Sequence, residues 1–186
     1  ARDGERIKAK QNVALIEGNA RAILAAERGA LGHIAAEAAF RDGRSEFDIH
    51  RAYCKAVGHT DPELPYGNII ALNEHGAVLH YTDLDREAPE SIRSFLIDAG
   101  AQVHGYASDI TRTYSNGDQR FQELIERMDA MELAIVDKVQ AGVDYRDLHV
   151  GTHKMLAEVL VDAELASGNP DTLLETGVTS AFFPHG

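Results

Sequence analysis

The segment that decides the fold runs from Phe95 to Tyr114 and reads FLIDAGAQVHGYASDITRTY. Short apolar runs on both sides of its centre predict two antiparallel strands, with a tight turn at about Val103 and His104. This register would place Asp98 directly opposite Asp109. A shift of one residue would make the two acids diagonal neighbours on the same face, because side chains alternate with period two. The sequence therefore predicts two carboxylates close together on one face of a hairpin.

Two acidic side chains held this close need a positive partner. Their Cβ atoms would lie about 5 Å apart, and the apolar residues around them would remove part of the water that normally solvates a carboxylate. A pair of divalent cations roughly 3.5 to 4 Å apart, bridged by carboxylates, meets this need and activates water near neutral pH. The alternative is that Asp98 is a turn residue and Asp109 a solvated strand position, with Arg112 as a surface ion partner.

The rest of the chain alternates between two kinds of pattern. Helix formers with apolar residues at three- and four-residue spacing predict helices, whereas short apolar runs between turn signals predict strands. The predicted helices span Val13–Phe40, with Gly29 and Gly32 as weak points, Glu46–Val57, Asp118–Gln140 and Tyr145–Ala166. The predicted strands span Asn68–Leu72, Val78–Tyr81, Ser94–Val103 and Tyr106–Tyr114, and a last extended piece follows the polar loop 167–170. Helices, an antiparallel meander and further helices indicate the α+β class.

Composition argues against several kinds of partner. A formal net charge of -12 and a sequence pI near 5.1 oppose binding to a phosphate backbone, so no nucleic-acid partner is expected. No stretch approaches the ~20 apolar residues that cross a bilayer, and residues 1–11 are charged rather than signal-like, so no membrane partner and a cytoplasmic location are expected. The single cysteine, Cys54, excludes an internal disulfide and is predicted to be a buried, inert thiol.

Two residue pairs with helical spacing could suggest metal sites. His149 and His153 stand four residues apart, but the acid of a helical zinc motif is missing between them, so an exposed helix face is predicted. His50 and Cys54 have the same spacing, but two potential ligands fall short of the three or four that zinc needs. Helix packing is therefore predicted for the second pair.

Longer motifs carry a resemblance to a known family. The run LIDAGA at 96–101, followed by GYASDITRT at 105–113, closely resembles the signature of the bacterial prolidases, the Xaa-Pro dipeptidases of the pita-bread metallopeptidase family. The runs LPYGNIIALNE at 64–74 and AVLHYT at 77–82 resemble that family's substrate-pocket strands. The run GVTSAFFPHG at 177–186 resembles the lead-in to its His-Gly-Leu-Gly-His stretch. The match spans roughly Gly32 to Gly186.

The resemblance implies a fold and a division of the chain. It implies an α+β fold that is the N-terminal part of a pita-bread domain, with helices packed on a curved antiparallel sheet. Residues 1–30 are then a helical lead-in or linker. Residues 31–186 are a partial catalytic domain that stops before the remaining metal ligands, so this stretch alone is not expected to hold the complete metal site.

The same resemblance assigns roles to five side chains. In the family, the first aspartate of the hairpin binds one metal ion and the second bridges two, and these positions fall on Asp98 and Asp109. His185 resembles a pocket histidine that contacts the substrate and helps to move protons, rather than a metal ligand. Tyr66 and His80 resemble residues that line the substrate subsite, and His80 is counted with His185 as catalytic. The missing ligands are one histidine and two glutamates beyond residue 186.

The implied chemistry is metal-assisted hydrolysis. A hydroxide bridging two divalent ions attacks the peptide bond before a C-terminal proline of a dipeptide. Manganese is favoured by oxygen-rich ligation, with cobalt and zinc as alternatives. Enzymes that resemble this sequence also hydrolyse organophosphorus esters, and a homodimer of the full-length protein is compatible with the resemblance. Two other functions stay open: a catalytically silent pita-bread module that binds peptides or proteins, and an Xaa-Pro aminopeptidase.

Overall fold

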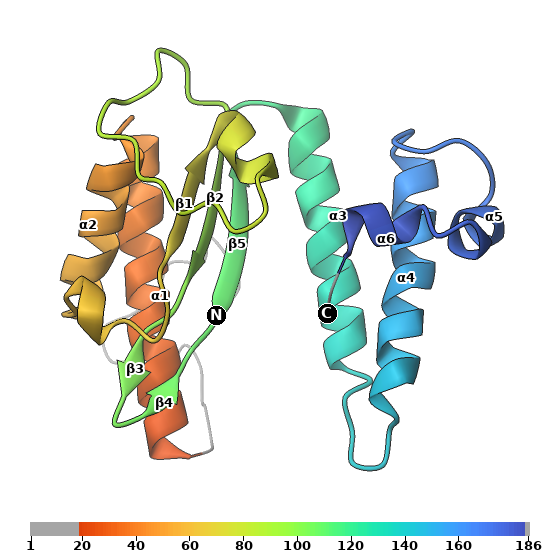
Figure 1. Cartoon of the computed structure of the whole chain (residues 1–186), viewed down its shortest axis with the longest axis horizontal. Coiled ribbons are helices and arrows are strands. Elements are labelled where there is room, and N and C mark those ends of the chain that lie inside the picture. The colour runs from red at the N-terminus through yellow and green to blue at the C-terminus, as the bar shows by residue number, and fades with distance from the viewer. Residues whose placement is uncertain (1–18, 185–186) are drawn as a thin grey trace, which may run out of the picture. The chain divides into compact units, whose positions relative to one another are not determined.

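The computed structural model describes residues 19–184, and the chain divides after Asn116 into two units (Figure 1). The first unit contains two helices and a small antiparallel sheet, and the second contains helices. The α+β prediction is confirmed. The division of the sequence at residue 30 stays a prediction.

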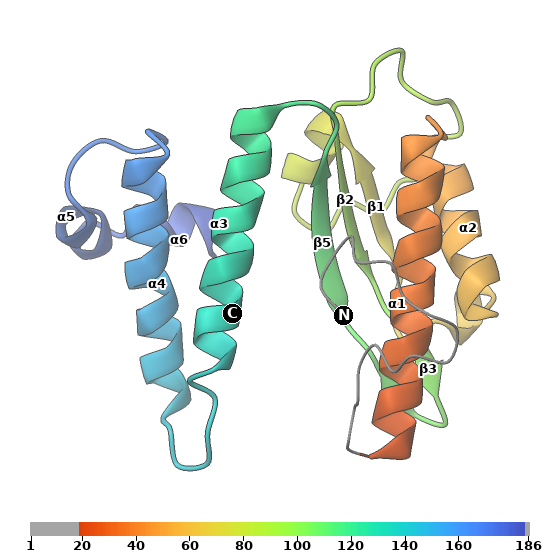
Figure 2. The same cartoon turned by 180° about the vertical axis from the view of Figure 1, so that it is seen from behind.

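The first unit is a pair of helices packed on three strands. Its elements in chain order are α1 (Ala20–Arg41), α2 (Glu46–Val57), η1 (Asp61–Glu63), β1 (Ile69–Leu72), η2 (Asn73–Ala77), β2 (Ser94–Ala99), β3 (Gln102–Val103), β4 (Tyr106–Ala107) and β5 (Ile110–Ser115). The antiparallel sheet has the order β1-β2-β5, and β3 pairs with β4 beyond its end. Figures 1 and 2 show α1 and α2 on the same face of the sheet.

Local sequence signals set the limits of α2. The Ser45 side chain accepts a hydrogen bond from the Asp48 backbone N–H at 3.2 Å, which satisfies one of the free donors at the helix start. The helix ends at Gly58, whose φ of 71° is costly for any residue with a Cβ atom. The predicted limits of this helix are confirmed.

The first helix continues through the two glycines that looked like weak points. A Cβ atom on Gly32 would collide with the Tyr53 ring and lie 2.7 Å from Val57 Cγ1. Both of these neighbours belong to α2. The glycine therefore serves the close approach of the two helices rather than a break in α1.

Alternation along β2 separates its two faces. Phe95, Ile97 and Ala99 are buried against α1 and α2, and the Phe95 ring stacks on Phe40 with centroids 5.2 Å apart. Burying a large apolar side chain in this way contributes about 1.5–3 kcal/mol. The intervening residues, including Asp98, are only partly buried and point to the opposite face.

The described part of the second unit consists of helices and the loops that connect them. It contains α3 (Gln119–Val136), α4 (Tyr145–Asp162), α5 (Pro170–Glu175) and α6 (Thr179–Phe182), and α3 and α4 form an antiparallel hairpin in Figure 1. Its core is formed by Met131, Leu156, Ala157, Leu160 and Leu173. The two long helices are confirmed, and each ends four residues earlier than predicted.

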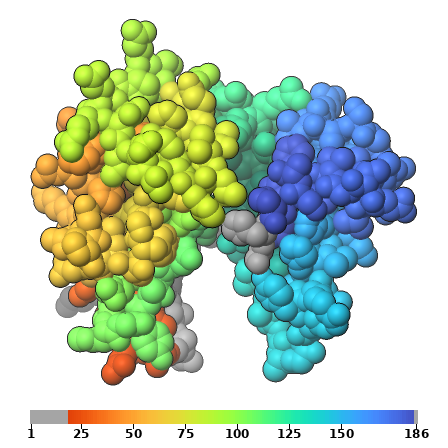
Figure 3. Space-filling view, in the orientation of Figure 1, coloured from red at the N-terminus to blue at the C-terminus, as the bar shows by residue number. Residues whose placement is uncertain are grey.

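Two predicted extended segments are wrong. Residues 78–81 form turns, and the segment that follows η2 runs along the surface of the first unit (Figure 3). The last segment forms α5 and α6 instead of an extended piece: Asn169 accepts a hydrogen bond from the Thr172 N–H at 2.9 Å, and Pro170 occupies the first helical turn. Asn-Pro is a loop signal that also starts helices, because an N-cap acceptor and a fixed φ suit both.

Within residues 19–184, no helix is both long and apolar enough to cross a membrane.

Candidate metal and substrate site

The hairpin places the two aspartates on one face, with its turn one residue later than predicted. Val103 pairs with Tyr106, and Asp98 lies opposite Thr111 rather than Asp109. Asp109 precedes β5 by one residue and is two positions from Thr111, so it faces the same side as Asp98. The two acids are therefore diagonal neighbours, which is the arrangement expected from a shift of one residue.

The Tyr66 hydroxyl group joins the two carboxylates. It lies 2.9 Å from Asp98 Oδ1 and 2.7 Å from Asp109 Oδ1. A phenol carries a single hydrogen, so it cannot fully satisfy both oxygens at once. Among the described residues, no other side chain donates a hydrogen bond to either carboxylate. Asp109 is exposed and Asp98 is partly buried, so water reaches the pair, but within residues 19–184 the protein supplies one side-chain donor to two acidic groups.

Gly100 allows the tyrosine to reach this position. A Cβ atom there would lie 2.9 Å from both Pro65 Cγ and Tyr66 Cε1, and it would collide with the Ser108 carbonyl oxygen. Contacts this short force a shift of backbone as well as side chains. The glycine in the Asp-Ala-Gly run thus makes room for the loop that brings Tyr66 onto the hairpin.

Burial and like charge act on the protonation of these groups. Burial chiefly raises the pKa of Asp98, and the neighbouring Asp109 adds to this, whereas the hydrogen bond from Tyr66 opposes it. Burial, followed by the hydrogen bonds to Asp109 and Asp98, raises the pKa of Tyr66, so the phenol stays a neutral donor. A bound cation would reverse the penalty on ionised Asp98, because opposite charge favours the carboxylate.

His33 interacts electrostatically with Asp98 but does not supply a positive charge. His33 is buried, and its Nε2 lies 3.4 Å from the Ala99 carbonyl oxygen. Burial lowers the pKa of His33, so the imidazole is neutral at physiological pH. The arrangement is suited to divalent cations held by oxygen ligands.

Another predicted site residue, His80, lies in a turn rather than in the predicted strand. His80 is exposed and has a φ of 56°, and it follows the end of β1 where Leu72 pairs with Phe95. Asp98 instead pairs with Ile69 at the start of that strand. The predicted strand around His80 is wrong because residues 78–81 form turns. The catalytic and substrate-binding roles of His80 stay predictions. His185 lies outside the described residues.

Glu46 is an important acid that the sequence patterns did not single out. Its side chain is 1% exposed and accepts four hydrogen bonds, from Leu72 N at 2.8 Å, His75 Nδ1 at 2.8 Å, the Tyr81 hydroxyl at 2.8 Å and Asp85 N at 3.0 Å. An acid in the first turn of a helix usually serves the helix dipole. A usable signal was its position on the same helical stripe as the buried residues Ile49, Tyr53 and Val57.

The structure also changes the interpretation of the two residue pairs with helical spacing, His149 with His153 and His50 with Cys54. His153 is buried rather than exposed, with Nδ1 2.9 Å from Thr179 Oγ1 and Nε2 3.1 Å from His149 Nε2. His50 and Cys54 gain a third potential metal ligand, Asp61, from the segment after α2. The expectation that no further ligand lies near that pair is therefore wrong.

Comparisons with known proteins agree with the fold. Residues 21–186 match the family described as Metallopeptidase family M24. The chain is 60% identical over 164 residues to an Xaa-Pro dipeptidase of Xanthomonas campestris pv. campestris (strain B100), covering 88% of this chain and 37% of the relative. It is 58% identical over 159 residues to an Xaa-Pro dipeptidase of Stenotrophomonas maltophilia (strain R551-3), covering 85% of this chain and 36% of the relative.

Two solved structures share this fold. Escherichia coli aminopeptidase P in its low-pH form aligns with a TM-score of 0.78 at 25% identity, covering 87% of this chain and 38% of that one. Pseudomonas aeruginosa aminopeptidase PepP aligns with a TM-score of 0.76 at 26% identity, covering 86% and 37%. The chain thus spans well under half of the length of the proteins that it matches.

Proposed function

This chain belongs to metallopeptidase family M24, and on that premise we propose that the intact protein hydrolyses Xaa-Pro dipeptides with the help of two divalent metal ions. The observation that carries the proposal is the pair formed by Asp98 and Asp109, which share a single hydroxyl donor. The relatives named as Xaa-Pro dipeptidases support the substrate class.

The residues present fit a cation. Asp98 and Asp109 would hold it, because their side chains lie on one face of the sheet and share one hydroxyl donor among the described residues. When bound, the two ions supply an activated water near neutral pH and polarise the carbonyl of the substrate. Oxygen-rich ligation favours manganese, with cobalt and zinc as alternatives.

The chain's own side chains position the reaction. The Tyr66 hydroxyl fixes the orientation of both carboxylates and stays protonated, because its pKa is raised. His80 and His185 are proposed to contact the substrate and to move protons. A peptide bond to proline has no N–H to donate, so a site that selects it reads the shape of the ring and the free termini of the dipeptide. Organophosphorus esters are a proposed side substrate, since a phosphoryl oxygen can take the carbonyl's place.

The organisation of the full-length protein is also proposed. Residues 31–186 form part of the catalytic domain, and residues 1–30 lead into it. Further metal ligands, one histidine and two glutamates, belong to sequence beyond residue 186. A homodimer of the full-length protein is compatible with this organisation.

The test is turnover by the full-length protein in the presence of Mn²⁺, with Gly-Pro-type dipeptides compared against longer peptides that begin Xaa-Pro. The proposal requires preferential cleavage of the dipeptides. It also requires that Asp109→Asn lowers kcat/KM more than roughly 100-fold, because even residues behind a metal ligand are worth 10–100-fold. The matched control is Asp129→Asn, an exposed acid of α3, which leaves turnover unchanged.

Three outcomes would refute the proposed function. Unaltered turnover in Asp109→Asn would remove the metal assignment. Equal or better cleavage of longer peptides would favour an Xaa-Pro aminopeptidase, since the two similar solved structures are named as aminopeptidases. Peptide binding without any hydrolysis by the metal-loaded protein would favour a silent binding module.

A further inference from the structure

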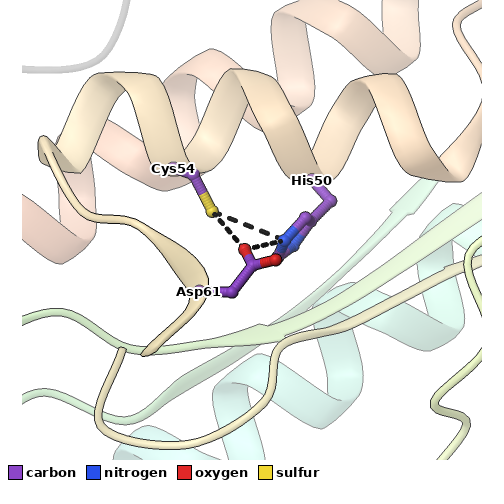
Figure 4. Close-up of side chains that lie close together, drawn as sticks. All are labelled: His50, Cys54 and Asp61. Carbon is purple, nitrogen blue, oxygen red and sulfur yellow. Dashed lines mark hydrogen bonds and ion pairs between the residues drawn. The ribbon is translucent and has the colours of Figure 1, made fainter. Parts of the chain in front are cut away.

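Three potential metal ligands meet beside α2, away from the aspartate pair. The distance from His50 Nε2 to Asp61 Oδ1 is 2.9 Å, that from Cys54 Sγ to His50 Nε2 is 3.5 Å, and that from Cys54 Sγ to Asp61 Oδ1 is 3.8 Å. Figure 4 shows the three atoms as the corners of a triangle. His50 and Cys54 lie one turn apart on α2, and Asp61 is the first residue of η1.

The geometry differs from that of a catalytic relay. In a cysteine–histidine–acid relay, the thiol and the carboxylate contact opposite nitrogens of the imidazole ring. Here Cys54 Sγ and Asp61 Oδ1 both face Nε2 of His50. All three ligand atoms therefore converge on one point instead of forming a chain.

The separations suit a tetrahedral cation. Zinc bonds of about 2.0–2.3 Å to nitrogen, oxygen and sulfur, at tetrahedral angles, place the ligand atoms about 3.4–3.6 Å apart. The two distances from sulfur are within a few tenths of an ångström of this. Only the His50–Asp61 distance has to open, and the Asp61 side chain is 78% exposed and free to move.

We propose that His50, Cys54 and Asp61 form a binding site for a divalent cation of the zinc class. A thiolate and an imidazole are ligands that zinc prefers, whereas manganese and magnesium prefer oxygen. Three protein ligands leave a fourth position, which water can fill from the exposed side of Asp61. The site is separate from the Asp98 and Asp109 pair and differs from it in ligand softness.

A buried amide behind the histidine supports this role. Asn68 is 7% exposed, its Nδ2 lies 3.5 Å from His50 Nδ1, and its Oδ1 has no partner among the described residues. Rotating the Asn68 side-chain amide by 180° exchanges its Oδ1 and Nδ2 atoms. Oδ1 then faces His50 Nδ1, and Nδ2 becomes the atom without a partner among the described residues. In that orientation Nδ1–H donates to Asn68, so the Nε2 lone pair is free for a metal ion. Metal-bound histidines are commonly held by such an acceptor.

Cation binding would displace the thiol proton. The ligand form of cysteine is the thiolate, whereas a free cysteine is mostly a neutral thiol at neutral pH. Binding of one M²⁺ forms the metal–sulfur bond, breaks the S–H bond and releases one proton to solvent, so the affinity rises with pH.

The location gives the site a structural consequence. Asp61 begins η1, and the loop that follows carries Tyr66 to the aspartate pair. A cation shared by α2 and η1 would anchor the start of this loop on the helix. The inference does not depend on the proposed peptidase activity, because it concerns different ligands.

The test uses Co²⁺ as a probe on the full-length protein, with Mn²⁺ already bound at the oxygen-rich site. Thiolate coordination gives a sulfur-to-cobalt charge-transfer band in the near ultraviolet, which oxygen and imidazole ligands do not produce. We expect this band in the wild-type protein, displacement by Zn²⁺, and an affinity that rises about tenfold per pH unit for one released proton. Cys54→Ser should abolish the band, and Asp61→Asn should weaken Co²⁺ binding at least about tenfold. Asp83→Asn, an exposed aspartate outside the cluster, should leave both unchanged.

Three results would overturn the proposed cation site. A folded wild-type protein without the band would show that a shared proton alone holds His50 and Asp61 together. The same band in Cys54→Ser would assign it to another cysteine of the full-length protein and overturn the site. If Cys54→Ser fails to fold, Asp61→Asn decides, since its side chain is exposed: unchanged Co²⁺ affinity would refute the ligand set.

Discussion

Two acidic sites of the first unit show opposite balances between charge and donors. Glu46 is one buried carboxylate with four hydrogen-bond donors. These are Leu72 N, His75 Nδ1, the Tyr81 hydroxyl and Asp85 N. Asp98 and Asp109 are two carboxylates that share one hydroxyl. A buried carboxylate is stable only when its lone pairs are satisfied.

The contrast separates a structural acid from a pair of acids that is proposed to bind a cation. The protein completes the surroundings of Glu46 by itself, so this residue ties the start of α2 to the segment after β1. It leaves the surroundings of Asp98 and Asp109 incomplete, and burial and mutual repulsion raise the pKa of Asp98. The number of protein donors per carboxylate therefore distinguishes the two sites and supports the cation proposed at Asp98 and Asp109.

The largest expected effect is on the satisfied site. Glu46→Gln keeps the shape of the side chain but turns one oxygen into an NH₂ group that faces donors. Removing one partner from a buried charged network costs about 3–5 kcal/mol, so we expect the free energy of unfolding to fall by about that amount in urea titrations. Glu90→Gln, at an exposed position, should change it little. Equal stability of the two variants would mean that Glu46 is not held as described.

A smaller effect is expected from removing the shared donor. Tyr66→Phe should lower the stability of the metal-free protein by about 1 kcal/mol, the typical net value of one hydrogen bond. It should also weaken Mn²⁺ binding by roughly 10- to 100-fold, because the phenol orients both carboxylates. The control is Tyr106→Phe, an exposed tyrosine of β4. Mn²⁺ affinity that is unchanged in Tyr66→Phe would deny the phenol this positioning role.

The smallest expected effect is a dependence of the free energy of unfolding on pH, which arises from His75 beside Glu46. The hydrogen bond to Glu46 raises the pKa of His75 above its usual value near 6.5. The protonated imidazole therefore contributes stability that is fully present below about pH 6.5 and is lost as the pH rises through the folded-state pKa. Unfolding measured from pH 6 to pH 9 should show a gap between wild type and His75→Gln that narrows with rising pH. A gap that stays constant would exclude this linkage, and His104→Asn, at an exposed position, is the matched control.

The sequence predicted the aspartate pair because period two tolerates an error in register. The turn moved by one residue, yet Asp98 and Asp109 stayed on one face. The partners of these acids were harder to foresee. Tyr66 reaches them from a loop more than thirty positions away in the chain, and Asp61 joins His50 only when η1 folds back onto α2.

The missed elements share a physical reason. The segment containing His80 has the apolar composition of a strand, but the residues form turns, and His80 adopts a positive φ. Helix α5 begins at Pro170 with Asn169 as its N-cap, and these two residues suit both loops and helix starts. In each case tertiary context decides between two local structures that the composition alone leaves nearly equal.

The most direct test compares the melting temperature of the full-length wild-type protein with that of Asp98→Asn, first without metal and then with saturating Mn²⁺. Without metal the variant should be the more stable at neutral pH, because it removes an ionised carboxylate that burial and Asp109 disfavour. With Mn²⁺ the order should reverse, because the ion stabilises only the protein that binds it well. A variant that is less stable under both conditions, or an equal rise in melting temperature for both proteins, would contradict the account.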